Sequence, residues 1–310
     1  MNASLIRNIS RCFVLLATLI AVSASAARAF DGPETSPEKE KELLAVLRAE
    51  ATPAEKAIAC KGLAIHGSAA AVADLAKLLP DPQLSSWARI ALEAIPGEAS
   101  NEALRDAANS LEGRLLVGMI NSIGVRRDAK AVDALTAKLQ DPDAEVASAA
   151  AVALGNIGNA DATKSLREAL AAAPANVRSA VAEGCVLCAE RLHVEGNAVA
   201  AAEIYDQVRQ ADVPRQRIIE ATRGAILARG QAGIPLLIET FHSTDNRMFQ
   251  LALGTVREFP GGDIDKALAA ELTDAAPDRA ALIVQAMADR PDTVVLAAVL
   301  KAAEQGDKQV

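Results

Sequence analysis

The sequence predicts an all-α protein built as a stack of helical hairpins, and three observations support this prediction. Alanine supplies 69 of the 310 residues, and it is both the best helix former and small enough for helices to approach closely. Only 2% of the residues are aromatic, which is too few for the packed faces of a β-sandwich or a β-barrel. Turn signals recur at a nearly constant spacing, which indicates one repeated structural unit.

The first thirty residues have the layout of a secretory signal peptide. Arg7 and Arg11 precede an apolar run at 12–22, and small residues follow at 24–29. Because the run is much shorter than the ~20 residues of a membrane-spanning helix, we expect cleavage after Ala29 and export to the periplasm or the cell exterior. Cleavage would change the charge from -8 to -11, since residues 1–29 hold three arginines and no acid. Residues 30–35 form a short polar linker.

Ser36 and Pro37 predict the start of the first helix. From there, turn signals fall at positions 53, 82, 112, 142, 174, 214, 245, 277 and 307, and seven of the eight steps span 29 to 32 residues. Seven glycines lie between these turns, as helix C-caps would: Gly67, Gly97, Gly124, Gly158, Gly196, Gly230 and Gly261. Each period is therefore predicted to be a helical hairpin, which buries its apolar faces only by stacking on its neighbours.

The segment 141–158 resembles a HEAT repeat, with Asp-Pro at 141–142 and an Ala-rich stretch at 149–158. Arg89 and Arg178 are similar to the arginine that follows a small or apolar residue at the second-helix start of this family, whereas Ala147 departs from it. The resemblance covers residues 36–310. It implies a right-handed α-α superhelix of the short bacterial, phycobilin-lyase-like type, found in extracytoplasmic proteins that hold other proteins.

The turns predict eight complete hairpins and half of a ninth. The half hairpin would begin near Thr293 and stop at Val310. A solenoid normally ends in a capping unit with a polar outer face, so we expect 36–310 to be the N-terminal part of a longer polypeptide.

The sequence favours a non-catalytic scaffold that binds protein and carries no cofactor. It contains no phosphate-binding loop, no Gly-x-Ser-x-Gly elbow and no His-Glu-x-x-His motif. Its net negative charge argues against nucleic acid as a partner. The alternative is a metal- or cofactor-linked protein of lyase or redox type, centred on Cys185 and Cys188 with His193 nearby. Two thiols at i and i+3 share a helix face, but small buried thiols are also common in helical cores.

Two groups of residues are candidate contacts for a protein partner. Trp87 and Tyr205 are candidate anchors, because aromatic residues contribute strongly to interfaces. Arg215, Arg217 and Arg223, together with Arg229, form a modest basic cluster after the one long step of 40 residues. That step suggests an insertion at 192–210 that bends the stack or presents a ledge.

Overall fold

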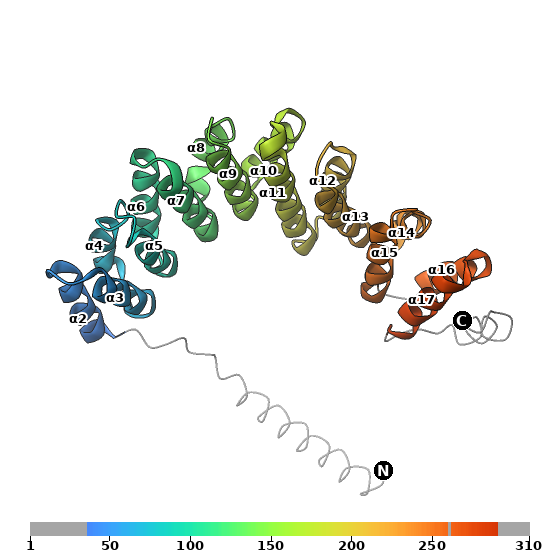
Figure 1. Ribbon diagram of the computed structural model, residues 1–310, viewed down its shortest axis with the longest axis horizontal. Helices are drawn as coiled ribbons and strands as arrows, with labels where there is room; N and C mark the ends of the chain where they lie inside the picture. Colours follow the sequence, from blue (N-terminus) through green and yellow to red (C-terminus); the bar gives the residue numbers. More distant parts are fainter. Residues whose placement is uncertain (1–35, 260–261, 291–310) are drawn as a thin grey trace, which may run out of the picture.

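The computed structural model describes residues 36–259 and 262–290, and every regular element in these residues is helical (Figure 1). The expected signal peptide at 1–29, the linker at 30–35 and the half hairpin that ends at Val310 lie outside the described residues. Within the described part of the chain, no helix combines the length and the apolar character needed to cross a bilayer.

Eight helical hairpins follow one another within residues 36–259 and 262–290. The first helices are α2 (Pro37–Arg48), α4 (Val72–Ala76), α6 (Glu98–Ser110), α8 (Val132–Lys138), α10 (Ala160–Ala172), α12 (Ala198–Gln210), α14 (Ile234–Phe241) and α16 (Asp263–Asp274). The second helices are α3 (Pro53–His66), α5 (Ser85–Ala94), α7 (Gly113–Arg126), α9 (Ala144–Ile157), α11 (Ala175–Val194), α13 (Arg215–Arg229), α15 (Asn246–Glu258) and α17 (Pro277–Ala288). Short 3₁₀ turns precede three first helices: η1 (Ala69–Ala71), η2 (Ala129–Ala131) and η3 (Gly230–Gly233).

The eight predicted tight turns within these residues are confirmed. Each lies at the first residue of a second helix or up to three residues before it. The capping chemistry explains this accuracy, because proline and small polar residues act locally. Thr52 shows this directly: its hydroxyl accepts a hydrogen bond from the Glu55 amide at 3.3 Å, and its own amide donates to the Glu55 carboxylate at 2.8 Å.

The predicted glycine C-caps are only partly confirmed. Gly67, Gly158 and Gly230 cap α3, α9 and α13, and the last two have positive φ angles of 59° and 53°. Gly261 lies outside the described residues. Gly97 instead precedes α6 as its N-cap. Gly124 lies inside α7, which continues to Arg126 before Arg127 adopts the left-handed conformation. Gly124 is needed there for space rather than for a turn, since a Cβ atom on it would lie 2.8 Å from the Ala153 Cα atom of α9.

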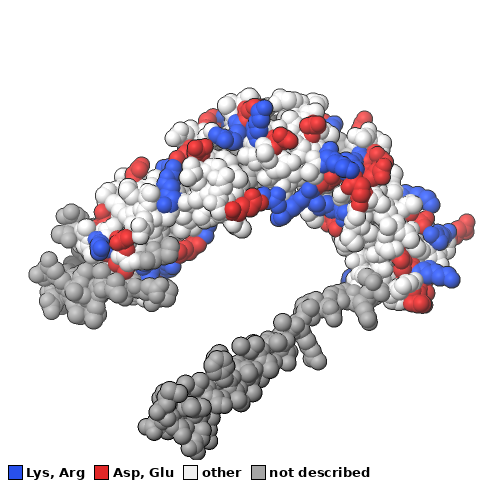
Figure 2. Space-filling view, turned by 180° about the vertical axis from the view of Figure 1, so that it is seen from behind, with Lys and Arg blue, Asp and Glu red and all other residues white. Residues whose placement is uncertain are grey.

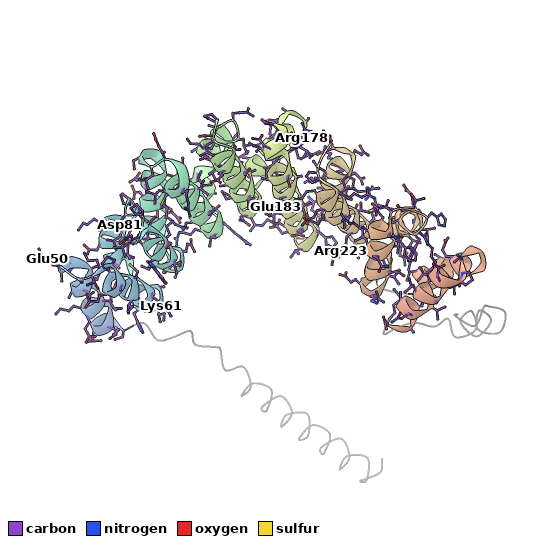
Figure 3. All side chains as sticks on the ribbon, viewed as in Figure 1. Glu50, Lys61, Asp81, Arg178, Glu183 and Arg223 are labelled. Atoms are coloured by element: carbon purple, nitrogen blue, oxygen red, sulfur yellow. The ribbon has the colours of Figure 1, made fainter. Side chains whose placement is uncertain are left out.

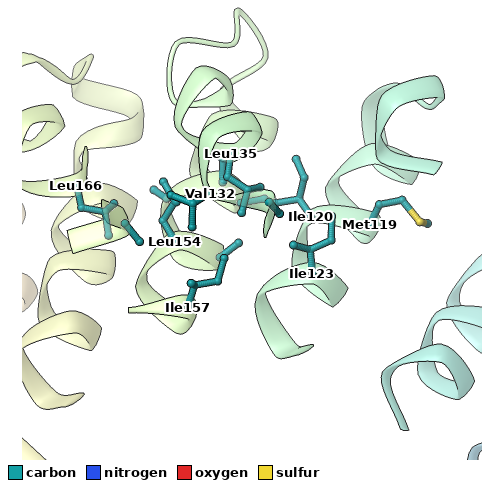
Figure 4. Close-up of a cluster of buried hydrophobic side chains, with 14 of the residues drawn as sticks. Met119, Ile120, Ile123, Val132, Leu135, Leu154, Ile157 and Leu166 are labelled. Carbon is teal, nitrogen blue, oxygen red and sulfur yellow. The ribbon is translucent and has the colours of Figure 1, made fainter. Parts of the chain in front are cut away.

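The hairpins stack into an open arc with the second helices toward its inner side (Figure 1). Side chains from consecutive hairpins interlock between the two helical layers. Ile120, Leu135 and Leu154 point from α7, α8 and α9 into one shared space (Figure 4) and are 1%, 3% and 0% exposed. The core therefore runs along the array, as expected for a repeat protein.

Neighbouring second helices approach very closely at small residues. A Cβ atom on Gly155 of α9 would lie 2.6 Å from the Gly184 Cα atom of α11. Beside this contact, Ala150, Ala151 and Ala153 of α9 are 0%, 0% and 1% exposed. Larger side chains at these positions would push the two backbones apart, which explains why an alanine-rich sequence suits this stack.

The expected insertion at 192–210 is not an inserted loop. The long step of 40 residues is taken up by α11, which has 20 residues, whereas α9 has 14 and α13 has 15. The end of α11 extends past its neighbours, and its last residue, Val194, is 86% exposed. An open groove of about 740 Å³ lies beside this extension, lined by Thr163, Arg167 and Ile204 among other residues of α10, α11 and α12.

Gly155→Ala tests the close contact between α9 and α11. We expect it to lower the free energy of unfolding by ~1–3 kcal/mol, because the added methyl group overlaps the Gly184 backbone. Gly254→Ala in α15 is the matched control, since a Cβ atom there meets nothing within 4 Å and alanine should stabilise the helix by about 0.5–1 kcal/mol. Thermal unfolding followed by circular dichroism measures both. Equal effects of the two substitutions would contradict the packing described here.

Candidate protein-binding surface

Charged residues of both signs are interspersed over the face seen in Figure 2. The predicted basic cluster on α13 follows this pattern and is not a free basic surface. Arg217 contacts Glu183 of α11 at 2.5 Å and Glu220 at 2.6 Å. Arg215 contacts Asp245, the N-cap residue of α15, at 2.5 Å.

Arg223 completes this arrangement from the middle of α13. Its Nε atom donates to Glu258 of α15 at 3.1 Å. Figure 3 labels Arg223 together with Glu183 on neighbouring second helices of the array. The three arginines thus join α13 to α11 and α15, because each pairs with an acid on an adjacent hairpin. Their role as contacts for a partner stays a prediction, and within the chain their charges are already paired.

Arginines at the ends of second helices also bind the preceding hairpin. Arg126 donates to the carbonyl oxygens of Leu92 at 2.6 Å and Ile95 at 2.7 Å, near the end of α5. Arg191 donates to the carbonyl oxygen of Ile157, and Arg290 donates to that of Val256 at 2.7 Å. Each of these pairs is 34 residues apart in the sequence, as Arg126 and Leu92 are. The last carbonyls of a helix lack partners inside it and carry partial negative charge, so these arginines stabilise helix ends.

The thiols of the Cys-x-x-Cys motif are buried between hairpins. Cys185 and Cys188 are 1% and 0% exposed. Burial raises the pKa of Cys185 to about 12 and also raises the pKa of Cys188, so both thiols are protonated at neutral pH. His193 is exposed near the end of α11. No group of three or more possible metal ligands occurs within 36–259 and 262–290.

Tyr205 is a core residue, which corrects its assignment as a contact anchor. It is 3% exposed, and its ring packs on Gly224 of α13, where a Cβ atom would lie 2.3 Å from the ring. Burial also raises the pKa of its hydroxyl above the ordinary value. A ring that is buried between two packed helices cannot contact a partner protein.

Trp87 lies on an exposed apolar face, as an anchor should. It is 39% exposed on α5, and Ile90 on the same helix is 47% exposed. On the adjacent α3, Ile58 and Ile65 are 69% and 43% exposed. Together these residues make up half of the eight large hydrophobic residues that are exposed in the described parts of the chain.

A groove of about 520 Å³ runs between these two helices. It is lined by Pro53, Ala54, Ala57, Ile58, Lys61, Gln83 and Trp87. Figure 3 labels Lys61 on the inner side of the arc. The three isoleucines were not predicted as contact residues, although the sequence holds a signal for two of them. Ile58 and Ile65 fall outside the spacing of the core residues Ala59 and Leu63 on α3.

Arg217→Glu tests whether the arginines of α13 join the hairpins. It would place a third carboxylate beside Glu183 and Glu220, and since Arg217 is only 17% exposed, we expect a loss of about 1 kcal/mol or more in unfolding free energy. Adding Glu183→Arg should recover part of this loss. Lys164→Glu is the control, since Lys164 is exposed and has no ion pair among the described residues. A thermal melt unchanged by Arg217→Glu would disprove the role.

A comparison with protein families agrees with this architecture for part of the chain. A family model described as HEAT repeats matches residues 102–185, from α6 into α11. No curated protein matches the sequence. Similar solved structures include an engineered protein, at 20% identity and a TM-score of 0.41 over 87% of this chain and 85% of that one.

Two natural proteins are similar at the same level. Human deoxyhypusine hydroxylase in complex with glycerol has 19% identity and a TM-score of 0.38, over 78% of this chain and 92% of that chain. The CpcE–CpcF complex of phycocyanin lyase from Nostoc sp. PCC7120 has 18% identity and a TM-score of 0.37, over 90% and 97%. At these TM-scores neither bears on what this chain binds. Residues 102–185 therefore carry HEAT repeats, within a HEAT-type α-solenoid that extends over the described residues.

Proposed function

We propose that this chain is a non-catalytic scaffold that binds another protein. The observation that carries the proposal is the gathering of Ile58, Ile65, Trp87 and Ile90 on the exposed sides of two adjacent helices. Single exposed hydrophobic residues are normal on a soluble protein, whereas a contiguous apolar patch marks an interaction site. HEAT repeats also typically bind proteins, which fits an open arc of hairpins.

The proposal includes an exported location. Its support is the arrangement of Arg7, Arg11, the apolar run at 12–22 and the small residues that end at Ala29. After cleavage the scaffold would act in the periplasm or outside the cell without inserting into a membrane. Nucleic acid is not a partner in this proposal, because the chain is acidic and the arginines of α13 pair with its own acids.

The alternative function, a metal- or cofactor-linked protein centred on Cys185 and Cys188, is not favoured by the surroundings of these residues. Both thiols pack in the core with raised pKa values, and the exposed His193 lies at the far end of α11. A packing role accounts for both cysteines.

The test expresses the chain with its own N-terminus and examines the exported fraction. We expect an exported form whose first residue is Phe30, identified by mass spectrometry, and a defined protein partner recovered after chemical cross-linking. An unrelated exported protein with the same affinity tag controls for non-specific capture. Retention of the full-length chain inside the cell would contradict export, and failure to cross-link any protein would indicate a spacer instead of a scaffold.

The same purified protein separates the scaffold from its alternative. If the chain is a scaffold, we expect less than stoichiometric metal and no visible absorption. A Cys185→Ala/Cys188→Ala variant should have the same metal content and absorption. Stoichiometric metal or a chromophore that is lost in this variant would establish the alternative.

A further inference from the structure

We propose that the groove between α3 and α5 binds an acidic amphipathic helix of another protein. The α3–α5 groove is the one lined by Ile58, Lys61 and Trp87 among other residues. The exposed Ile65 and Ile90 lie on the same two helices outside its lining. The inference rests on the proposed scaffold function and adds to it the location of the site and the chemistry of the partner.

The apolar residues of the groove form one stripe on each helix. On α3, Ala54, Ile58, Lys61 and Ile65 are separated by four, three and four residues, which places them on a single side. This side differs from the core side, because Ala59 and Leu63 are 1% and 0% exposed whereas Ile58 is 69% exposed. The exposed isoleucines therefore lie outside the packed core between the hairpins.

The same register continues on α5. Gln83, at the turn before the helix, is followed at intervals of four and three residues by Trp87 and Ile90. Gln83 and Trp87 line the groove together with Ala54 and Ile58 from α3. Two parallel stripes with a hollow between them accept the ridge of a third helix, in the way that helix surfaces commonly interlock.

The backbone chemistry of the groove favours a helical partner. The walls are α-helices, in which the amide and carbonyl groups are already hydrogen-bonded within each helix. An extended peptide buried against them would find no backbone partners, and unpaired buried amides are costly. A helix satisfies its own backbone and presents apolar side chains at i, i+3, i+4 and i+7. The stretch from Ala54 to Ile65 is about 16 Å long at 1.5 Å per residue, which corresponds to three turns of a partner helix.

The charge of the groove favours an acidic partner. Lys61 is the one charged residue that lines it, and Lys61 is exposed without an ion pair or side-chain hydrogen bond among the described residues. No acid lines the groove, although the whole chain carries -8. A second copy of this chain, docked groove to groove, would place the same cation opposite Lys61, whereas an acidic helix complements Lys61.

Trp87 makes the α3–α5 groove directly observable, because it is the only tryptophan in the chain. Its emission reports the surroundings of the groove and of no other site. Any ligand that covers the ring should shift the emission to shorter wavelength, since the half-exposed indole would lose contact with water.

The experiment titrates the exported form of the full chain with a synthetic helical peptide of about four turns, with leucines on one face and glutamates on the other. We expect a saturable shift of Trp87 emission, and at least about tenfold weaker binding of the same peptide with lysines in place of the glutamates. Ile58→Asp should weaken binding of the acidic peptide at least about tenfold, as loss of a central apolar anchor does. Lys61→Glu should reverse the preference between the two peptides.

Val199→Asp is the matched control. Val199 is 74% exposed at the start of α12, far along the chain from the groove, so peptide binding should not change. Circular dichroism confirms that each variant is folded, which separates loss of binding from loss of structure.

Four outcomes would overturn the inference. The first two are no emission shift with the acidic peptide and equal affinity for both peptides. The third is an emission shift caused by protein concentration alone, which would indicate a second copy of the chain. The fourth is a shift with phosphatidylglycerol vesicles but not with peptide, which would indicate a lipid surface. If cross-linking recovers a partner while the acidic peptide leaves Trp87 unchanged, the site assignment fails and the scaffold function stands. If no partner is recovered, the scaffold function itself fails.

Discussion

The close contact between neighbouring second helices is the constraint on which the rest of the structure depends. Gly155 of α9 and Gly184 of α11 face each other with no room for a Cβ atom on Gly155, and Gly124 of α7 meets Ala153 of α9 in the same way. These contacts explain why alanine is so abundant and aromatic residues so few. Dispersion between closely packed backbones and small side chains then stabilises each hairpin against the next.

Ion pairs and arginine caps act on the same interfaces from their edges. Arg126 and Arg290 bind carbonyl oxygens of the preceding second helix. Arg217 pairs with Glu183 of the adjacent hairpin. Lys61 in the α3–α5 groove, in contrast to these arginines, has no ion pair among the described residues. The interfaces that build the array and the surface proposed for a partner thus use different residues.

The sequence predicted the hairpins well because their turns depend on local chemistry. A helix start depends on residues only a few positions apart, such as Thr52 and Glu55 at the start of α3 or Pro174 directly before α11. Contacts between hairpins were not predictable in this way. Arg217 and Glu183 are 34 residues apart, so their pairing depends on the register of the stack, and a basic cluster was inferred in its place. Tyr205 was misjudged for the same reason, because its burial depends on Gly224 of the next helix.

The central claim is that close contact between second helices holds the array together. Amide hydrogen exchange measured along the chain tests this claim most directly. The account predicts the slowest exchange in the middle of the stack, in α9 and α11, where Gly155 and Gly184 bring the two backbones together and where a locally packed unit opens least often. Faster exchange should appear toward α3 and α17. Slowest exchange in α3 or α17, with α9 and α11 opening readily, would contradict the account.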